Sequence, residues 1–142
     1  MADRYSKERR SRLMARIRSK GNKATELRFI RLLRLKQISG WRRHLNLPGK
    51  PDFVFEQNML AVFIDGCFWH GCPKCYAEPK TNVMFWRNKI ARNRARDRMA
   101  TRTLRKLGWQ VIRIWQCDLG REIRVEKKLR RGLVPSLKKR AT

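Results

Sequence analysis

Residues Leu60–Cys75 read LAVFIDGCFWHGCPKC and join a candidate buried strand to a polar, cysteine-rich loop. The apolar, β-branched run is typical of a strand buried in a sheet, and Gly66 ends it. The loop brings together cysteines with metal-ligand spacing (Cys67, Cys72, Cys75), polar candidates for catalysis (Asp65, His70) and large flat side chains (Phe68, Trp69). A packed core does not require this mixture at the end of a strand. We therefore interpret the stretch as an active site braced by a metal ion.

The composition predicts a partner with many negative charges. The chain of 142 residues carries 37 Lys and Arg against 11 Asp and Glu, a formal net charge of +26. Because matching acids are missing, we expect nucleic acid, with an anionic membrane surface as the alternative. No run of about 18 apolar residues is present, and MADRYSKERR lacks the apolar part of a signal peptide. We expect one domain over residues 1–142 and a soluble, monomeric, cytoplasmic protein that stays with the nucleoid through DNA binding.

The pattern of apolar residues predicts helices and strands in mixed order. A short, strongly basic amphipathic helix within residues 1–21 is expected either to dock on the body of the protein or to grip DNA as an arm. The further expected elements are a helix from an Asn22 cap to about Gln37, a strand Trp41–Leu47, strands Asp52–Glu56 and Leu60–Asp65 joined as a hairpin, a helix from about Val83 to Leu107, a strand Trp109–Trp115, a helix of roughly Arg121–Arg131 and a basic tail over residues 132–142.

Two acids are expected at one edge of the sheet. Asp52 begins one strand of the hairpin and Asp65 ends the other, and antiparallel pairing brings such positions together. Two close carboxylates suit Mg²⁺, although two exposed turn acids are the simpler alternative. His70 next to them could transfer protons, whereas His44 is expected on the surface. Glu26 lies in the first turn of its helix, where the helix dipole alone also favours an acid.

Four cysteines can close a tetrahedral zinc site. Cys67, Cys72 and Cys75 share the loop, and Cys117 follows a predicted strand. In a reducing compartment this pattern favours metal binding over disulfides. A site with four thiolates has no open position, so the zinc is expected to be structural. Two alternatives stay open: four small buried hydrophobic residues, or His70 as the fourth ligand.

Several segments resemble one enzyme family over roughly residues 6–118. LPGKPDFVF, VFIDGCFWHGCP, FWRNKIARNRARD and LGWQVIRIWQC are similar to segments of the very short patch repair (Vsr) mismatch endonucleases. The resemblance implies a restriction-endonuclease-like α/β/α sandwich with a mixed sheet. It also implies a bacterial enzyme that cuts one strand of double-stranded DNA 5′ to the thymine of a T·G mismatch, which arises from deaminated 5-methylcytosine. A cytosine methyltransferase and mismatch-repair proteins are the functional partners that it implies.

The resemblance also implies roles for individual residues. Asp52 would be the principal Mg²⁺ ligand, His70 the catalytic histidine and Glu26 an acid near the metal-bound water. The backbone carbonyl of Ile64 would replace the second acid of ordinary restriction enzymes, with Asp65 beside it as a further ligand. A standard nuclease core would place a lysine two residues after Asp65, where this chain has Cys67. The role of that lysine would therefore pass to His70.

Mismatch selection is expected to use the deformability of DNA. Phe68, Trp69 and Trp86 could enter the stack as wedges, with Met14 in the opposite groove and Lys89 and Asn93 at base edges. For Trp86 the alternative is ordinary helix core. Two rival functions remain: a nuclease of the same fold with different specificity, and a non-catalytic, zinc-stabilised nucleic-acid-binding protein.

Overall fold

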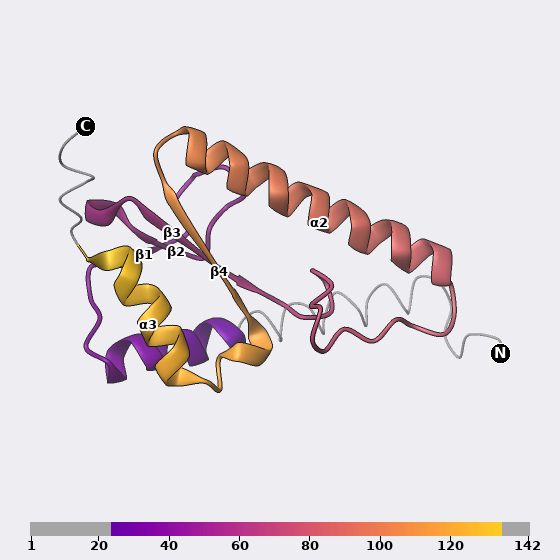
Figure 1. Ribbon diagram of the computed structural model, residues 1–142, viewed down its shortest axis with the longest axis horizontal. Helices are drawn as coiled ribbons and strands as arrows, with labels where there is room; N and C mark the ends of the chain where they lie inside the picture. The colour runs from indigo at the N-terminus through magenta and orange to yellow at the C-terminus, as the bar shows by residue number, and fades with distance from the viewer. Residues whose placement is uncertain (1–23, 135–142) are drawn as a thin grey trace.

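A computed structural model describes residues 24–134, in which helices and strands follow in mixed order (Figure 1). The first helix is described from residue 24 to residue 35. It is followed by β1 (Arg42–Arg43), β2 (Phe53–Phe55), the 3₁₀ helix η1 (Glu56–Asn58), β3 (Leu60–Asp65), α2 (Val83–Lys106), β4 (Gln110–Trp115), the 3₁₀ helix η2 (Gln116–Asp118) and α3 (Glu122–Leu133). The predicted arm with Met14, the predicted cap at Asn22 and most of the predicted tail lie outside the described residues. No helix in the described part of the chain is both long and apolar enough to cross a membrane.

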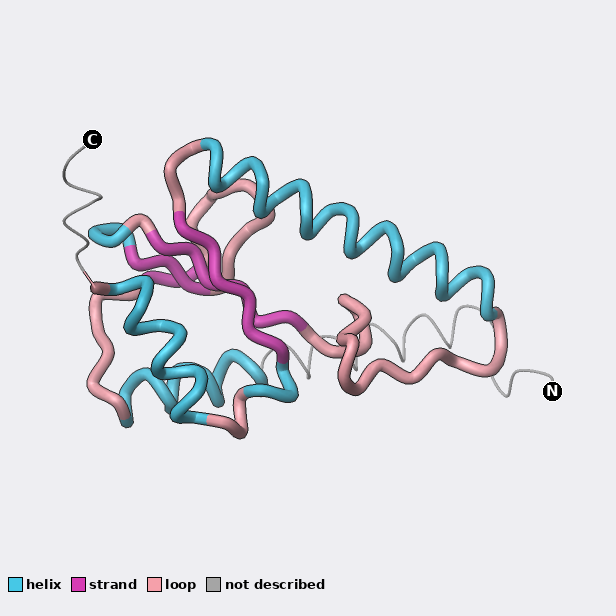
Figure 2. Tube along the Cα trace, viewed as in Figure 1, coloured by secondary structure: helices cyan, strands magenta, loops and turns pink. Residues whose placement is uncertain are grey.

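The four strands form one mixed sheet in the order β1-β2-β3-β4 (Figure 2). β2 pairs antiparallel with β1 and with β3, so the predicted hairpin is confirmed. β3 and β4 are parallel, with Phe63 beside Arg113 and Ile64 beside Ile114. Parallel neighbours need a crossover, which here consists of the loop after β3 and the long helix α2. This crossover carries several of the candidate functional residues, among them His70, Trp86 and Asn93, and α2 packs on one face of the sheet.

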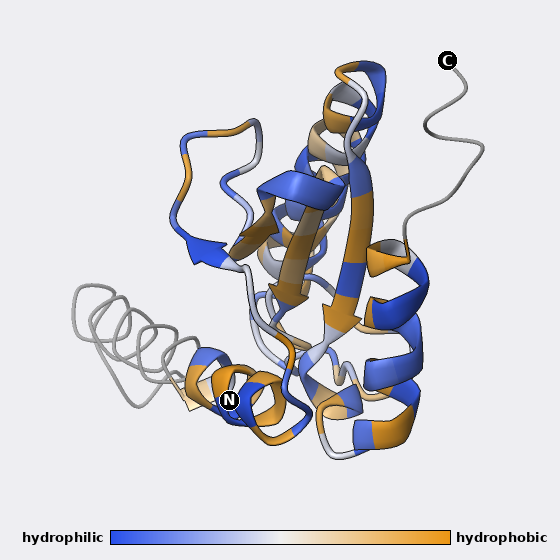
Figure 3. Cartoon of the chain, turned by 90° about the vertical axis from the view of Figure 1, so that its left-hand side faces the viewer, coloured by the Kyte–Doolittle hydropathy of each residue, from blue (hydrophilic) through white to orange (hydrophobic). Residues whose placement is uncertain are grey.

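β3 is buried on both faces, and helices pack against each of these faces (Figure 3). Leu60, Val62 and Ile64 belong to the main core, together with apolar residues of the first helix and of α3. Ala61 and Phe63 point to the other face, where they pack with Leu104 of α2. Alternate residues of a strand point to opposite faces, so a continuous apolar run is what a strand between two helical layers requires. The predicted α/β class with a mixed sheet is confirmed.

Several boundaries predicted from the sequence are wrong, and β2 and β4 each begin one residue later than predicted, at Phe53 and Gln110. The strand expected over Trp41–Leu47 is limited to Arg42–Arg43, because His44 has a left-handed backbone (φ +58°) and the chain then turns. The strand expected to reach Glu56 ends at Phe55, since Glu56 opens η1. The tail expected from residue 132 begins later, because α3 continues to Leu133. Gly132 is buried there, and a Cβ at this position would lie 3.0 Å from Leu60.

The turn before β2 passes directly under α2. Gly49 has a φ of +76°, and a Cβ at this position would lie 2.5 Å from the Cβ of Ala100. The same Cβ would lie 3.4 Å from the ring of Phe63. Only a glycine satisfies both the backbone angle and this close approach.

We expect Gly49→Ala to destabilise the protein more than Gly40→Ala. Gly40 also has a positive φ, +87°, but nothing lies within 4 Å of a Cβ there. Gly40→Ala therefore measures backbone strain alone, about 1–2 kcal/mol, whereas the contact with Ala100 should cost Gly49→Ala about 1–3 kcal/mol more. Equilibrium denaturant unfolding of both variants measures the difference. Equal losses of unfolding free energy would contradict the close packing of the turn on α2.

Candidate functional site

A cavity of about 590 Å³ lies beside the carboxyl end of β3. Its walls come from the first helix, the turn before β2, β3, the loop after β3, α2 and β4. The lining residues include Glu26, Asp52, Ile64, Asp65, His70, Asn93, Asp97 and Arg113. The structure therefore brings together all of the residues that the sequence analysis expected at the catalytic centre.

Asp52 is held at the entry to β2 by the backbone of β3. Its Oδ2 accepts a hydrogen bond from the N–H of Ile64 at 2.7 Å. Burial is the largest cause that raises the pKa of Asp52, and the hydrogen bond from the Ile64 N–H lowers it. The negative charge of Glu26, its hydrogen bond with Asp52 and the negative charge of Asp65 also raise the pKa, which reaches about 7. A carboxyl group with neighbours of its own sign is stabilised when a cation balances the cluster. The donor set thus fits a hard divalent cation.

Glu26 reaches the cavity from the first helix. Arg43 Nη2 donates to Glu26 Oε2, and the Arg43 guanidinium lies 5.7 Å from the centre of the Phe53 ring. Glu26 is thus fixed by a cation on β1 while it faces Asp52. A favourable helix dipole alone does not explain an acid that lines this cavity.

His70 is bound to an acid that the sequence analysis missed. Its Nδ1 lies 2.6 Å from Asp97 Oδ2 and 4.0 Å from Asp65 Oδ1. Burial lowers the pKa of His70, but the hydrogen bond to Asp97 and the charges of Asp65 and Asp97 outweigh it, so the pKa lies above its ordinary value. The available signal was an acid among arginines in FWRNKIARNRARD, four residues after Asn93 and therefore on the same side of α2.

Arg113 is the second residue that the sequence analysis missed. Its Nη1 donates to both oxygens of Asp65, at 3.0 and 3.2 Å, and its Nη2 donates to the backbone carbonyl of Asp97 at 3.0 Å. The guanidinium also lies 4.0 Å from the centre of the Phe63 ring, as the register of β3 and β4 dictates. Burial raises the pKa of Asp65, and Arg113 and His70 oppose that rise. The available signal for Arg113 in the sequence was a single arginine inside the apolar strand WQVIRIW.

Asp65 has a different main partner from the one expected. Both of its carboxylate oxygens bind Arg113, so its charge is already compensated without a metal ion. Within residues 24–134 Asp52 has no such cationic partner, although it is close to Glu26, which is paired with Arg43. The geometry therefore favours Asp52 over Asp65 as the principal ligand of a cation.

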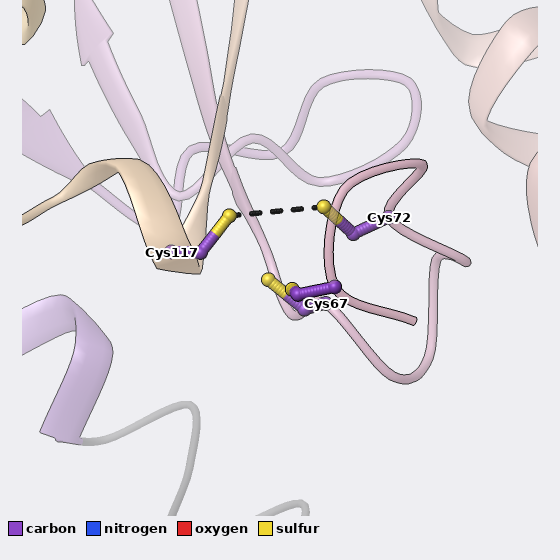
Figure 4. A group of neighbouring side chains, drawn as sticks. Cys67, Cys72 and Cys117 are labelled. Carbon is purple, nitrogen blue, oxygen red and sulfur yellow. Dashed lines mark hydrogen bonds between the residues drawn. The ribbon is translucent and has the colours of Figure 1, made fainter. Parts of the chain in front are cut away.

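The four cysteine sulfurs form a separate cluster (Figure 4). All four lie within 4.8 Å of one another, and those of Cys72 and Cys117 are 3.7 Å apart. A tetrahedral zinc site with bonds of about 2.3 Å has sulfurs about 3.8 Å apart, so the spacing fits zinc. Burial tends to raise the pKa of Cys72, but backbone N–H groups of Lys74 and Cys75 donate to its sulfur and lower the pKa to about 7. This environment favours a thiolate at Cys72, whereas burial raises the pKa of the Cys67 and Cys117 thiols.

The structure contradicts one alternative for the cysteines and does not favour the other. Cys75 and Cys117 are exposed, so the four residues are not a buried hydrophobic set. His70 is also not needed as a fourth ligand, because its Nδ1 binds Asp97 and the four sulfurs gather without it. Lys74 Nζ binds Asp118 and ties the cysteine loop to η2.

Aromatic rings cover the loop on the side of α2. Phe68 packs edge-on against Trp69, with ring centres 5.1 Å apart, and against Trp86 at 5.3 Å. Trp86 is only 6% exposed, so its predicted wedge role is wrong for this conformation and the helix-core alternative holds. The neighbouring Phe85 is 53% exposed.

The residues predicted at base edges lie next to these rings. Asn93 donates a hydrogen bond to the Trp69 carbonyl at 2.9 Å, so its amide supports the loop and lines the cavity. Lys89 is half-buried one helical turn before it. Phe68 and Trp69 are half-buried, and their role as wedges stays a prediction.

Comparisons with known proteins identify the family to which this sequence is similar. The family described as DNA mismatch endonuclease Vsr matches residues 2–77. The chain is 39% identical over 140 residues to the type II nicking enzyme V.XorIIP of Xanthomonas oryzae pv. oryzae, which covers 96% of this chain and 100% of that protein. This chain belongs to the Vsr family. It is also 39% identical over 125 residues to the DNA mismatch endonuclease Vsr of Escherichia coli, which covers 86% of this chain and 79% of that protein.

Membership of the Vsr family decides between two of the function classes. Vsr proteins are endonucleases that act on DNA, so this chain is an endodeoxyribonuclease. The alternative of a non-catalytic, zinc-stabilised binding protein is wrong. The specificity within the Vsr family is a separate question.

We expect Asp97→Asn to lower the pKa of His70 in this Vsr protein. The substitution removes a charge and weakens a hydrogen bond that raise the pKa, while the burial that lowers it remains. The chain has two histidines, so NMR titration of the ring protons without added Mg²⁺ gives a simple readout, with the exposed His44 as internal control. An unchanged His70 titration would contradict the assigned pairing.

Proposed function

We propose that this protein is a Mg²⁺-dependent endonuclease that nicks one DNA strand 5′ to the thymine of a T·G mismatch. The observation that carries the proposal is the group of Asp52, Glu26 and His70 in one cavity beside the ring-bearing loop. The relative named DNA mismatch endonuclease Vsr supports the substrate. The sheet with helices on both faces supports a restriction-endonuclease-like fold.

The excess negative charge around Asp52 supports a divalent cation in the cavity. We assign Asp52 and the backbone carbonyl of Ile64 to hold Mg²⁺, with Glu26 near its water and Asp65 at the edge of the group. When bound, Mg²⁺ would neutralise charge on the phosphate and make a water molecule more acidic. Carboxylate and carbonyl oxygens are the ligands that Mg²⁺ prefers.

His70 is assigned to move protons during hydrolysis. Because Nδ1 binds Asp97, the opposite ring atom, Nε2, is the one that can accept or return a proton. Arg113 fixes the carboxylate of Asp65 and the backbone of Asp97, which limits the positions that the ring can take. Lys50 and Arg96 line the cavity and can contact phosphate oxygens.

The rings of the loop suit recognition by deformation. Phe68 and Trp69 are assigned to enter the stack beside the mismatch, where unstacking costs at most a few kcal/mol per step. A T·G pair resembles a matched pair at its edges, so its lower resistance to deformation is the better signal. A cytosine methyltransferase would create the substrate, because deaminated 5-methylcytosine is thymine, and mismatch-repair proteins are proposed as further partners.

The cysteine cluster is assigned to a structural Zn²⁺. The loop after β3 has no regular secondary structure up to α2, yet it carries His70, Phe68 and Trp69. A metal ion held by Cys67 and Cys72 on this loop and by Cys117 on η2 would fix both segments. Cys75 completes the set of four thiolates.

We expect Asp52→Asn to abolish Mg²⁺-dependent nicking and to leave DNA affinity nearly unchanged. The amide oxygen can still accept the Ile64 N–H, so the fold should persist, but the charge that favours the cation is lost. Affinity depends mainly on the many Lys and Arg contacts with phosphates. Nicking of a labelled T·G duplex and equilibrium binding measure the two effects.

Glu56→Gln is the matched control for Asp52→Asn, because Glu56 is an exposed acid paired with Arg42. It should retain full activity. Mapped cuts on matched, T·G and other mismatched duplexes then test the specificity. Equal cutting of all duplexes would support the rival nuclease of different specificity, and an active Asp52→Asn variant would contradict the assigned metal ligand.

We expect Cys117→Ser to lose about one equivalent of zinc and to lower the unfolding temperature. The substitution removes a ligand of the proposed site without touching the cavity. Elemental analysis of the purified protein and thermal unfolding measure both effects. His70→Ala should keep its zinc, and loss of zinc from that variant instead would contradict the four-thiolate assignment.

A further inference from the structure

One flank of α3 is basic and carries hardly any compensating acid. Val125, Leu129 and Gly132 bury one side of this helix against the sheet. On one flank of α3, Glu126 pairs with Lys36 and Arg130. The other flank borders a groove of about 830 Å³ and carries Arg121, Arg124, Lys127, Lys128 and Arg131. Glu122, in the first turn, is the one acid among the residues that line this groove.

A second basic groove lies between α2 and β4. It has a volume of about 580 Å³ and is lined by Arg98, Thr101, Arg102, Arg105, Lys106, Asp97 and Arg113. Asp97 is already bound to His70 and Arg113, so its charge is not available to the other cations. The groove therefore offers positive charge without a competing free carboxylate.

The helices that carry the two basic grooves pack on opposite faces of the sheet, and β4 is the last strand of that sheet (Figures 1 and 3). Arg113 lines the groove of α2 with its guanidinium, and its backbone carbonyl accepts a hydrogen bond from Lys128 of α3 at 2.8 Å. We call the basic residues of both grooves, apart from Arg113, the β4 strip. Its members are Arg98, Arg102, Arg105, Lys106, Arg121, Arg124, Lys127, Lys128 and Arg131.

The α2 part of the β4 strip faces away from the catalytic cavity. Successive residues of a helix are rotated by about 100°, which puts Arg98, Arg102 and Arg105 on the flank roughly opposite Arg96 and Ala100. Arg96 and Ala100 line the catalytic cavity, together with the turn before β2. Arg98, Arg102 and Arg105 thus lie on the flank of α2 that points away from the cavity, although Asp97 and Arg113 line both the cavity and the groove of α2.

Most cations of the β4 strip have no partner within residues 24–134. Lys128 donates to a carbonyl group, but the side chains of the others make no ion pair or hydrogen bond to a described residue. All are exposed, so within the described part of the chain no acid balances this concentration of like charge. A surface with this spacing of cations over two helices suits the repeated phosphates of a nucleic acid.

We propose that the β4 strip binds a second segment of duplex DNA while the first occupies the catalytic cavity. Each phosphate contact releases counterions, so this binding is independent of sequence and sensitive to salt. The enzyme can then stay on DNA through the strip while the cavity meets new base pairs. The inference requires only that the chain acts on DNA and does not depend on the T·G specificity.

The test measures whether protein that is bound to one DNA duplex captures a second duplex. Wild-type protein is bound to an immobilised short T·G duplex without added Mg²⁺, and capture of a fluorescent matched duplex is measured over a range of salt concentrations. The strip variant is Arg102→Gln, Arg124→Gln and Arg131→Gln combined. The control variant combines Lys36→Gln, Arg42→Gln and Arg130→Gln, which removes the same charge from cations that are already paired with glutamates.

We expect the strip variant to capture roughly tenfold less of the second duplex, with a salt slope smaller by about 2 to 3. Its binding to the first duplex and its nicking of a short T·G duplex should equal those of the control variant. Thermal unfolding checks that both variants fold. Absence of capture by wild-type protein, unchanged capture by the strip variant, or an equal loss in the control variant would overturn the proposal. Nicking by wild-type protein tests the proposed function separately.

Discussion

The catalytic half of the molecule depends on the ion pair between the buried carboxylate of Asp65 and the guanidinium of Arg113. Asp65 is 4% exposed at the end of a strand that is apolar on both faces, so its charge must be compensated within the protein. Arg113 on β4 supplies the compensation and also binds the backbone of Asp97 on α2. Loss of one partner of such a buried pair typically costs about 3–5 kcal/mol. One guanidinium thus fixes two strands and a helix relative to one another.

The loop after β3 takes no part in this ion pair. Contacts at its two ends hold it in place. At one end the four sulfurs gather beside η2, and Lys74 binds Asp118. At the other end Phe68 packs on Trp86, and Asn93 binds the Trp69 carbonyl. The ring of His70 lies between these supports, bound to α2 through Asp97. A loop that carries a catalytic group on no regular element needs this kind of support, because catalytic geometry tolerates little displacement.

The sequence was sufficient where local pattern decides the structure. β3 was predicted at Leu60–Asp65 because an apolar run between two helical layers needs no polar face, and the hairpin places Asp52 and Asp65 in one cavity as its antiparallel pairing predicted. Asp97 and Arg113 were missed because their contact depends on how α2 is rotated over the sheet, which no local pattern encodes. The strand over Trp41–Leu47 was wrong for a similar reason, since alternation of apolar residues does not show the left-handed backbone at His44.

The distribution of acids links DNA binding to the cation. Four of the 11 acids of this strongly basic chain, Glu26, Asp52, Asp65 and Asp97, line one cavity. The surface as a whole attracts phosphates, but a phosphate that approaches Asp52 meets carboxylates, while Arg113 is already committed to Asp65. The potential beside Asp52 is therefore less favourable to phosphate than that beside Lys50 and Arg96, which line the same cavity. A divalent cation held by these carboxylates would reverse this local difference, so we expect the ion to help the scissile phosphate of an already bound duplex to approach Asp52.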